Sequence, residues 1–575
     1  MTYSLVARSL ISLALNSVIG ICLKRYLRIV LDSTSKVDYA GERLFMKVLV
    51  IDALARCTGK RYATMDVIGS GPRIVAGIVN EYFETALYPY EYVVKNISMT
   101  KNFDLILISA MSTDKLAVER LVSEIRKKGF TGKIILGGPI GFEYQWLLMH
   151  IPGIDIVVLG EAEIPLSILL RRMRDHDDTY DDIPALAYKS GDKIVLTSKN
   201  INTPREILSS IKPWVKIDHS YQCPWIYRIY VEVVRGCSNF RRPMIRGQGG
   251  LNCISCGKCY SQDMTERLKC PAEIPPGCGF CSVPGVFGPP RSRSVKSIVK
   301  EIEGLISHGA RRIVLSAPDF LDYGRDIVID PVTDPCDPPA NLDALEELLN
   351  AVCSLQEVCN KRVVVMIENL KACLVNDEVA KLLGKYLKWT TVHIGLETGC
   401  DDFNTYVLGK PITLRHVLDA CKLLIQNGLR PYVYLMHSLP FADRDTYVKT
   451  KKAIQELANI GVEKITLYKY MSLPATAFEK IPPMDRYKDE IMALKKLVNN
   501  YNMITKRDLV GKDIEVFLLK GDKGAIYGYP VYHGPVVFVR GRFTKNPNGC
   551  RALVRITNIY SRYVEGVLVR ILECP

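Results

Sequence analysis

The sequence contains no apolar run long enough to predict a membrane span. The run from Leu10 to Leu23 is closely flanked by charged residues and is shorter than the roughly 20 residues that cross a bilayer. It also lacks the clear small-residue cleavage site of a secretory leader. We therefore expect residues 1–45 to be an N-terminal extension or a peripheral helix, ahead of a domain that begins near Met46. We expect the protein to be cytoplasmic, without a membrane span.

The sequence also lacks a solenoid-type repeat and a highly charged tail. Its 76 Lys and Arg residues outnumber 61 Asp and Glu residues, and the net charge of +15 is spread along the chain. A hydrophobic content of 48% and a charged content of 24% are typical of a globular protein. The basic balance favours a polyanionic partner such as RNA, tRNA included. The alternative is a basic enzyme without such a partner.

Cysteine is abundant, but its distribution argues against a disulfide framework. Seven of the 18 cysteines fall between Cys237 and Cys281. Disulfide-dense secreted modules are small and follow a signal peptide. Clustered cysteines in a chain of 575 residues therefore indicate a metal centre.

Residues 46–175 alternate apolar strands with amphipathic helices, which predicts a Rossmann-like, doubly wound parallel sheet. Ligands of such sheets bind beyond the carboxyl ends of the strands. The strands that we expect are Lys47–Ile51, Leu105–Ser109, Lys133–Leu136 and Asp155–Leu159. The polar segments that follow three of them are Ser109–Asp114, Gly137–Pro139 and Gly160–Glu163.

A second αβ rhythm follows a connecting segment, residues 176–226, in which we expect a small hairpin. Strand Tyr230–Val234 opens this rhythm, and Ser294 is a suitable N-cap for a helix with a 3.6-residue apolar stripe. Six parallel strands with outer helices predict a partial (β/α)₆ barrel over residues 227–504. Its chemistry should lie at the carboxyl ends of the strands. A Cys-rich insertion, residues 238–277, interrupts this barrel.

Residues 505–575 lose the helical period and show short alternating strands between glycines, which predicts a small β barrel. Basic and aromatic side chains alternate in it and suggest a face that follows an RNA backbone. The alternative is a solvated basic barrel that packs on the core. The basic residues are Arg540, Arg542, Lys545, Arg551, Arg555, Arg562 and Arg570.

The cysteine pattern around the first barrel strand resembles that of the radical S-adenosylmethionine (radical SAM) superfamily. Those enzymes hold a 4Fe-4S cluster by three cysteines, usually C-x3-C-x2-C, on the loop after that strand. Here the motif is split: VRGC ends at Cys237, and GCGFCSVP supplies Cys278 and Cys281. The resemblance implies that these three bind the catalytic cluster, with Phe280 against the adenine. An alternative triad begins at Cys270 instead of Cys237.

Four further cysteines in the insertion can ligate a second metal centre completely. Cys253, Cys256 and Cys259 have C-x2-C-x2-C spacing, and Cys270 follows as a remote fourth. The pattern resembles a ferredoxin-type 4Fe-4S site, and four cysteines also make a structural zinc site. We expect an auxiliary cluster or zinc.

Segments at later strand ends resemble the superfamily in the same order. SAPDF places Asp319 at the barrel mouth, and HIGLETG is similar to the GLESG segment of radical SAM cores. The resemblance implies that Glu397 and Thr398 lie near the amino or ribose groups of S-adenosylmethionine, and that Asp319 contributes to cofactor binding. It also implies reduced ferredoxin or flavodoxin as electron donor.

The flanking domains resemble two modules that accompany such cores. Residues 46–175 resemble a cobalamin-binding domain, although the histidine of D-x-H-x-x-G is absent after Asp52. The last domain is similar to the TRAM domain of tRNA methylthiotransferases. The resemblance implies a radical SAM enzyme that produces a 5′-deoxyadenosyl radical, with cobalamin-dependent methyl transfer as the leading hypothesis. A tRNA methylthiotransferase-like enzyme and a non-catalytic, metal-stapled RNA-binding protein are the alternatives.

Overall fold

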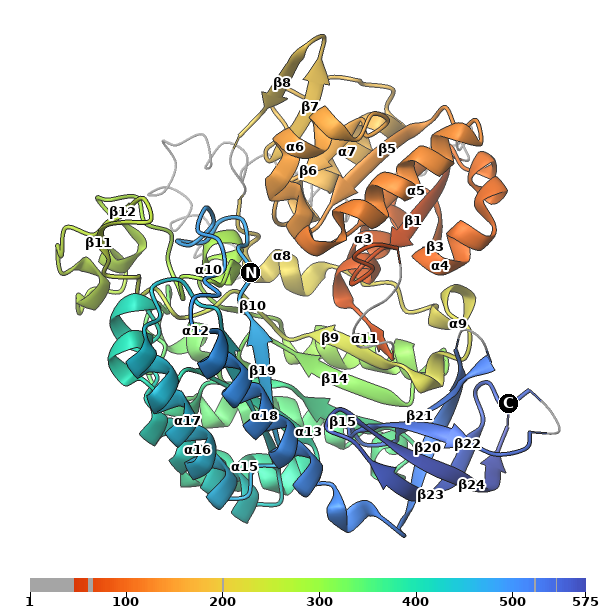
Figure 1. Cartoon of the computed structure of the whole chain (residues 1–575). Coiled ribbons are helices and arrows are strands. Elements are labelled where there is room, and N and C mark those ends of the chain that lie inside the picture. The colour runs from red at the N-terminus through yellow and green to blue at the C-terminus, as the bar shows by residue number, and fades with distance from the viewer. Residues whose placement is uncertain (1–45, 60–65, 199–200, 522–523, 544–545, 575) are drawn as a thin grey trace, which may run out of the picture.

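The computed structural model describes residues 46–59, 66–198, 201–521, 524–543 and 546–574. The predicted extension, residues 1–45, and Lys545 lie outside these ranges. Figure 1 shows an α/β domain at the top, a partial barrel below it and a small β barrel at the lower right. Among the described residues, no helix combines the length and apolarity needed to cross a membrane.

The N-terminal domain is a seven-stranded sheet in the order β3-β1-β4-β5-β6-β7-β8. Its strands are β1 (Lys47–Asp52), β3 (Glu84–Pro89), β4 (Leu105–Ser109), β5 (Lys133–Gly137), β6 (Ile156–Val158), β7 (Leu186–Ser190) and β8 (Lys193–Leu196). Its helices are α3 (Ser70–Asn80), α4 (Tyr90–Lys95), α5 (Lys115–Lys127), α6 (Tyr144–His150) and α7 (Glu163–Arg174). The first five strands in this order pair in parallel, which confirms the doubly wound prediction. The hairpin expected in the connecting segment is β7–β8, and it extends this sheet antiparallel.

The partial barrel contains the six parallel strands expected from the sequence. They are β9 (Arg228–Glu232), β14 (Arg312–Ser316), β15 (Val364–Ile367), β17 (Thr391–Glu397), β18 (Arg430–His437) and β19 (Lys464–Lys469). The larger outer helices are α11 (Val295–Ser307), α13 (Leu342–Cys353), α15 (Asp377–Leu387), α16 (Leu414–Gln426), α17 (Arg444–Asn459) and α18 (Lys488–Ile504). Ser294 caps α11 by accepting a hydrogen bond from the Ser297 N–H, as its position predicts. One strand was unexpected: β2 (Val67–Ile68), from the N-terminal region, pairs with β9.

Short elements connect the two α/β bodies and the barrel strands. They are α8 (Arg205–Ser210), α9 (Ile217–Ser220), β10 (Val234–Arg235), α10 (Val283–Phe287), β13 (Arg291–Ser292), α12 (Arg325–Val328), α14 (Gln356–Cys359) and β16 (Asn369–Leu370). The Cys-rich insertion forms a side lobe with a small hairpin, β11 (Arg246–Gln248) and β12 (Leu251–Asn252), at the left of Figure 1. The two ends of this lobe meet, since the Gly277 N–H donates to the Arg241 carbonyl at 2.8 Å.

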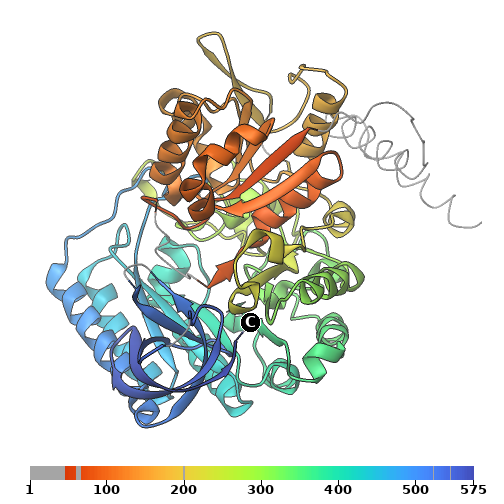
Figure 2. The same ribbon diagram turned by 90° about the vertical axis from the view of Figure 1, so that its right-hand side faces the viewer.

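The C-terminal strands close into a barrel in the order β20-β21-β22-β24-β23, which confirms the predicted small β barrel. They are β20 (Asp513–Lys520), β21 (Ile526–Pro530), β22 (Val536–Arg540), β23 (Arg551–Ile559) and β24 (Tyr563–Glu573). Figure 2 shows this barrel in dark blue below the N-terminal domain and against the partial barrel. Two bonds fix that contact: Trp225 Nε1 donates to the Gly549 carbonyl at 2.8 Å, and the Thr391 hydroxyl lies 2.7 Å from His533 Nδ1.

Candidate active site

The loop after β10 carries Cys237 to the carboxyl end of the barrel. Gly236 has φ +92°, and a Cβ there would lie 2.2 Å from the Pro289 carbonyl oxygen, so only glycine allows this close approach. The Cys237 N–H donates to the Gly288 carbonyl at 3.0 Å. Gly288 ends α10, the helix that follows Cys281. The chain therefore returns to Cys237 after the insertion.

The segment Cys278–Cys281 is a tight turn pressed against the loop after β19. The Cys281 N–H donates to the Cys278 carbonyl at 2.8 Å, and the Phe478 N–H donates to the Gly279 carbonyl at 2.9 Å. A Cβ at Gly279 would lie 2.6 Å from the Phe478 ring, so this position also excludes larger residues. Phe280 is partly buried against the core, and its contact with adenine stays a prediction.

Asn239 connects two of the three cysteines. Its N–H lies 3.4 Å from Cys237 Sγ, and its Nδ2 donates to Cys278 Sγ at 3.3 Å. Burial, with a contribution from the neighbouring Cys237, raises the pKa of Cys278 to about 11 and that of Cys281 to about 12. The three thiols are partly buried and lie close enough to affect one another's pKa, so thiolates form there only with compensating positive charge such as iron. The residues therefore fit a cluster with three thiolate ligands.

Among the described residues, no group of three or more Cys, His, Asp or Glu side chains gathers closely enough to hold one metal ion. A cubane does not require such a group, because each thiolate of a 4Fe-4S cluster binds a different iron. A zinc ion instead needs four sulfurs at about 2.3 Å from one point. Cys253, Cys256, Cys259 and Cys270 are not brought together in this way, and Cys256 is exposed. Their assignment to a second centre stays a prediction.

A buried lysine lies beside Cys237. Lys371 Nζ contacts Asp319 at 2.9 Å, Asp322 at 2.6 Å and the Ser238 hydroxyl at 2.9 Å. Asp319 also accepts from the Lys371 N–H, so its carboxylate is held within the loop network. The predicted contact between Asp319 and the cofactor is therefore untested, and its observed partner is Lys371.

The GLETG segment carries a second buried ion pair close to the thiols. Glu397 has φ +69° at a bulge of β17, and its carboxylate accepts from Lys410 Nζ at 2.5 Å. The charge of Lys410 lowers the pKa values of Cys278 and Cys281, against the larger effect of burial. The Thr398 hydroxyl bonds Asn404 at 2.7 Å and so stabilises this turn. Roles for Glu397 and Thr398 in S-adenosylmethionine binding stay predictions.

The N-terminal sheet docks beside Cys237 through buried ion pairs. Arg235 contacts Glu163 at 2.6 Å, Glu232 at 2.7 Å and Glu161 at 3.1 Å. Arg291, which faces Arg235 across the β10–β13 ladder, contacts Glu161 at 2.6 Å. Glu161 and Glu163 follow β6 at the carboxyl edge of the sheet. The carboxyl edges of both sheets therefore face the same interface.

The same edge lacks a histidine at the position of the cobalt ligand. Leu54 stands there, and its side chain lies against Gly69, whose Cβ would be 2.7 Å away. Asp114 holds this loop by accepting from the N–H groups of Ala55, Arg56 and Cys57 at 2.8–3.0 Å. Cys57 has φ +46° where the motif has glycine, so the loop keeps that backbone conformation. A corrinoid bound at this edge would therefore receive no histidine ligand from the position of Leu54.

The sequence did not point to Asn239, Lys371, Lys410 or Arg235. Asn239 and Arg235 adjoin Cys237, and that proximity was the available signal. Lys371 and Lys410 follow no motif, and only the fold brings them to the thiols.

A parallel sheet with a Rossmann-like neighbour and three convergent, partly buried thiols defines a radical SAM protein with a cobalamin-type domain. The Radical SAM superfamily model matches residues 275–454, and the B12 binding domain model matches residues 64–170. The uncharacterized protein MK0932 of Methanopyrus kandleri is 37% identical over 92% of this chain and 97% of its own length. The chain belongs to the family of that protein, within the radical SAM superfamily.

Two further likenesses cover less sequence or only the fold. The ribosomal protein uS12 methylthiotransferase RimO of Thermotoga maritima is 26% identical over 49% of this chain and 64% of its own length. The radical SAM methyltransferase TsrM of Kitasatospora setae, solved with cobalamin and a [4Fe-4S] cluster, superposes with a TM-score of 0.55. That match has 13% identity and covers 76% of this chain and 77% of TsrM, so it shows a shared fold.

Proposed function

We propose that this protein cleaves S-adenosylmethionine at a 4Fe-4S cluster bound by Cys237, Cys278 and Cys281, and uses cobalamin at the N-terminal sheet for methyl transfer. The observation that carries the proposal is the convergence of these three partly buried thiols across a 40-residue insertion. When bound, the cluster supplies the electron that splits S-adenosylmethionine into methionine and a 5′-deoxyadenosyl radical.

The residues of this chain would support that chemistry in three ways. Asn239 would donate hydrogen bonds to two thiolate sulfurs, and such bonds tune cluster potential. Lys371 and Lys410 place buried positive charge beside the thiolates. Arg235 and Arg291 hold the edge of the N-terminal sheet against the barrel mouth, which would keep a corrinoid facing the radical and exclude water.

The test is anaerobic reconstitution of the full chain, with iron, sulfide, zinc and cobalt analysis and assay of S-adenosylmethionine cleavage. Cys237→Ala should lose the catalytic cluster and the formation of 5′-deoxyadenosine. The matched control is Cys359→Ala, which removes an exposed thiol on α14. Normal cleavage by Cys237→Ala, with no loss of iron, would contradict the ligand assignment. No cleavage by the reconstituted wild-type chain would favour the non-catalytic alternative.

The same analysis separates the two predictions for the insertion. An auxiliary cluster doubles the iron content of the wild-type chain, and Cys256→Ala should then lower the iron content but leave the catalytic cluster in place. A zinc site gives one equivalent of zinc that Cys256→Ala removes.

The second candidate is a methylthiotransferase-like enzyme, which the likeness to RimO and the closed C-terminal barrel favour. The cysteine distribution argues against it, because methylthiotransferases carry auxiliary-cluster cysteines in the N-terminal domain. Here Cys57 is the single cysteine of residues 46–174. Stoichiometric cobalt after reconstitution with cobalamin supports methyl transfer, whereas cobalt-independent turnover that adds sulfur to the product supports the second candidate.

A further inference from the structure

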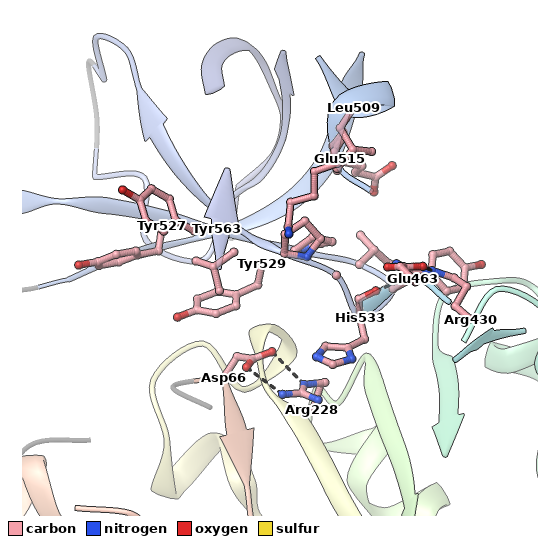
Figure 3. A pocket seen from close by; sticks show the side chains of 18 of the residues that line it. Asp66, Arg228, Arg430, Glu463, Leu509, Glu515, Tyr527, Tyr529, His533 and Tyr563 are labelled. Carbon is pink, nitrogen blue, oxygen red and sulfur yellow. Dashed lines mark hydrogen bonds and ion pairs between the residues drawn. The ribbon is translucent and has the colours of Figure 1, made fainter. Parts of the chain in front are cut away.

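A large cavity lies at the end of the partial barrel opposite to the three thiols. It has a volume of about 1060 Å³ and lies between the amino ends of the barrel strands and the C-terminal β barrel (Figure 3). Strand β18 runs from Arg430 in the cavity to His437 at the other end, so roughly 23 Å of strand separates the two ends at ~3.3 Å per residue. The cavity is therefore distinct from the proposed radical site.

Positive charge dominates this cavity. Among the described residues that line it, eight Lys and Arg side chains face four carboxylates. Arg228 and Arg312 share one of those carboxylates, Asp66, at 2.9–3.2 Å, and Arg430 pairs with Glu463. In Figure 3, Asp66 and Arg228 form the floor below the C-terminal barrel.

Four cations that line the cavity form no ion pair among the residues that the structure describes: Lys361, Lys464, Lys506 and Arg562. Lys464 lies over the Tyr432 ring, 5.3 Å from its centroid. Lys506 Nζ donates only to the carbonyls of Asn502 and Ser561. Burial lowers the pKa of Lys464, and the charge of Arg562 lowers it further. Burial and the charge of Lys464 lower the pKa of Lys506 to about 8, against a smaller opposing effect of Glu463.

An aromatic wall faces these cations from the C-terminal barrel. The rings of Tyr527 and Phe538 are 5.0 Å apart, and those of Phe538 and Tyr563 are 4.6 Å apart, on three adjacent strands. Figure 3 shows Tyr527, Tyr529 and Tyr563 along the upper side of the cavity. Ring faces of this kind bind planar aromatic groups by stacking.

We propose that this cavity binds a nucleoside phosphate, with the phosphate at Lys464, Lys506 and Arg562 and the base against the aromatic wall. The volume is that of a site for a cofactor-sized molecule, so inorganic phosphate would leave most of it open. Cations without ion pairs next to a wall of aromatic rings are the combination that recognises one nucleotide unit. A free nucleotide and the phosphorylated end of an RNA strand offer the same chemistry. This proposal is independent of the radical chemistry.

The experiment measures binding to the full chain by calorimetry for AMP and inorganic phosphate, and by fluorescence anisotropy for an RNA oligonucleotide with and without a 5′-phosphate. Arg562→Gln and Lys464→Gln should each weaken AMP binding by about tenfold or more, because each removes a charge-assisted contact. Tyr563→Leu should weaken binding of AMP but not of phosphate. The matched control is Arg570→Gln, an exposed arginine of β24 outside the cavity.

Tighter binding of the 5′-phosphorylated RNA than of AMP identifies an RNA end as the source, and equal or weaker RNA binding identifies a free nucleotide. Either result supports the site. Absence of AMP and RNA binding to the wild-type chain would overturn the proposal. So would an equal loss in Arg570→Gln and Arg562→Gln, since that result would indicate general surface charge.

Discussion

Arg235→Met tests whether the buried ion pairs hold the N-terminal domain on the barrel. Arg235 is the sole cation in contact with Glu163 among the described residues, whereas Glu161 keeps Arg291 when Arg235 is removed. All three of Arg235, Glu161 and Glu163 are buried. The substitution therefore leaves Glu163 as a buried carboxylate without a cationic partner, although the Thr203 hydroxyl still donates to it. Methionine fills most of the space of the aliphatic stem.

The expected cost follows from that geometry. Removing one partner of a buried pair typically costs about 3–5 kcal/mol. At about 1.4 kcal/mol per factor of ten, opening of the interface becomes roughly 100-fold to several-thousand-fold more frequent. The control Lys127→Met removes an exposed pair with Glu124, which is worth about 0–1 kcal/mol.

Hydrogen exchange is the appropriate assay, because a chain of several domains has no single free energy of unfolding. Amides of β10, β13 and the start of α7 should lose protection in Arg235→Met but not in Lys127→Met. Burial raises the pKa of Glu163, and Arg235 outweighs that effect and lowers it. In the wild type, the stabilising contribution of Glu163 is therefore present above its unfolded pKa near ~4.3 and is lost as the pH falls through the lower folded value. In the variant, protonation of Glu163 removes the unpaired charge, so the difference between the two proteins should shrink below about pH 5.

Two results would refute this reasoning. One is protection at β10 and α7 in Arg235→Met that matches the control, which would mean that the pairs do not hold the interface. The other is a loss of protection that is independent of pH, which would point to packing rather than to an unpaired carboxylate.

Four further predictions concern single positions. Gly279→Ala places a Cβ 2.6 Å from the Phe478 ring and should lower iron incorporation on reconstitution. The control Gly71→Ala, whose Cβ would have its nearest contact at 3.7 Å, should not lower it. Equal iron contents of the two variants would disprove the steric argument. Lys410→Met leaves the buried Glu397 without its cation and should lower the hydrogen-exchange protection of the β17 amides by about 3–5 kcal/mol. Lys385→Met, at an exposed pair, should cost less than about 1 kcal/mol, and equal losses would count against the prediction. Burial lowers the pKa of His393 to about 3, so below its unfolded pKa near ~6.5 the unfolded chain binds a proton that the folded chain does not, and stability falls by up to ~1.4 kcal/mol per pH unit. His393→Phe should therefore reduce the loss of stability between about pH 6.5 and 4. An unchanged pH slope of urea unfolding would contradict this prediction. Because Leu54 replaces the histidine ligand, the electron paramagnetic resonance spectrum of bound cob(II)alamin should lack hyperfine coupling to a protein nitrogen, and its presence would show that another histidine reaches cobalt.

The elements with a strong local pattern were predictable from the sequence. The predicted bounds of β4 agree with the structure, because its apolar run is continuous and buried. Strand β3 was missed, since ETALYP at the edge of the sheet has neither an apolar run nor strict alternation. Strand β21 was missed for a similar reason, because glycine and proline interrupt it.

The sequence predicted the cysteines that the cluster requires, but it did not predict which charged side chains lie beside them. Three thiols are needed for a cluster, and VRGC and CGFC supply them at a strand end. Lys371 and Lys410 are more than a hundred residues from Cys237 in sequence, and no spacing rule relates a lysine to a distant thiol. The pairing of β2 with the barrel strand β9 could not be predicted from the sequence either, because two apolar residues are too few to indicate a strand or its partner.

The arrangement around Cys237 couples the docking of the N-terminal domain to the position of the first proposed cluster ligand. Arg235, two residues before Cys237, contacts Glu161 and Glu163 of the N-terminal domain, and Gly236 between them packs against the Pro289 backbone without space for a side chain. A shift of the N-terminal sheet would therefore move the first cluster ligand. Since the other two thiols belong to a turn fixed by Phe478, such a shift would change the spacing of the three sulfurs. The insertion can be long because its two ends are joined at this same point, so its length does not alter the position of Cys237 relative to Cys278 and Cys281.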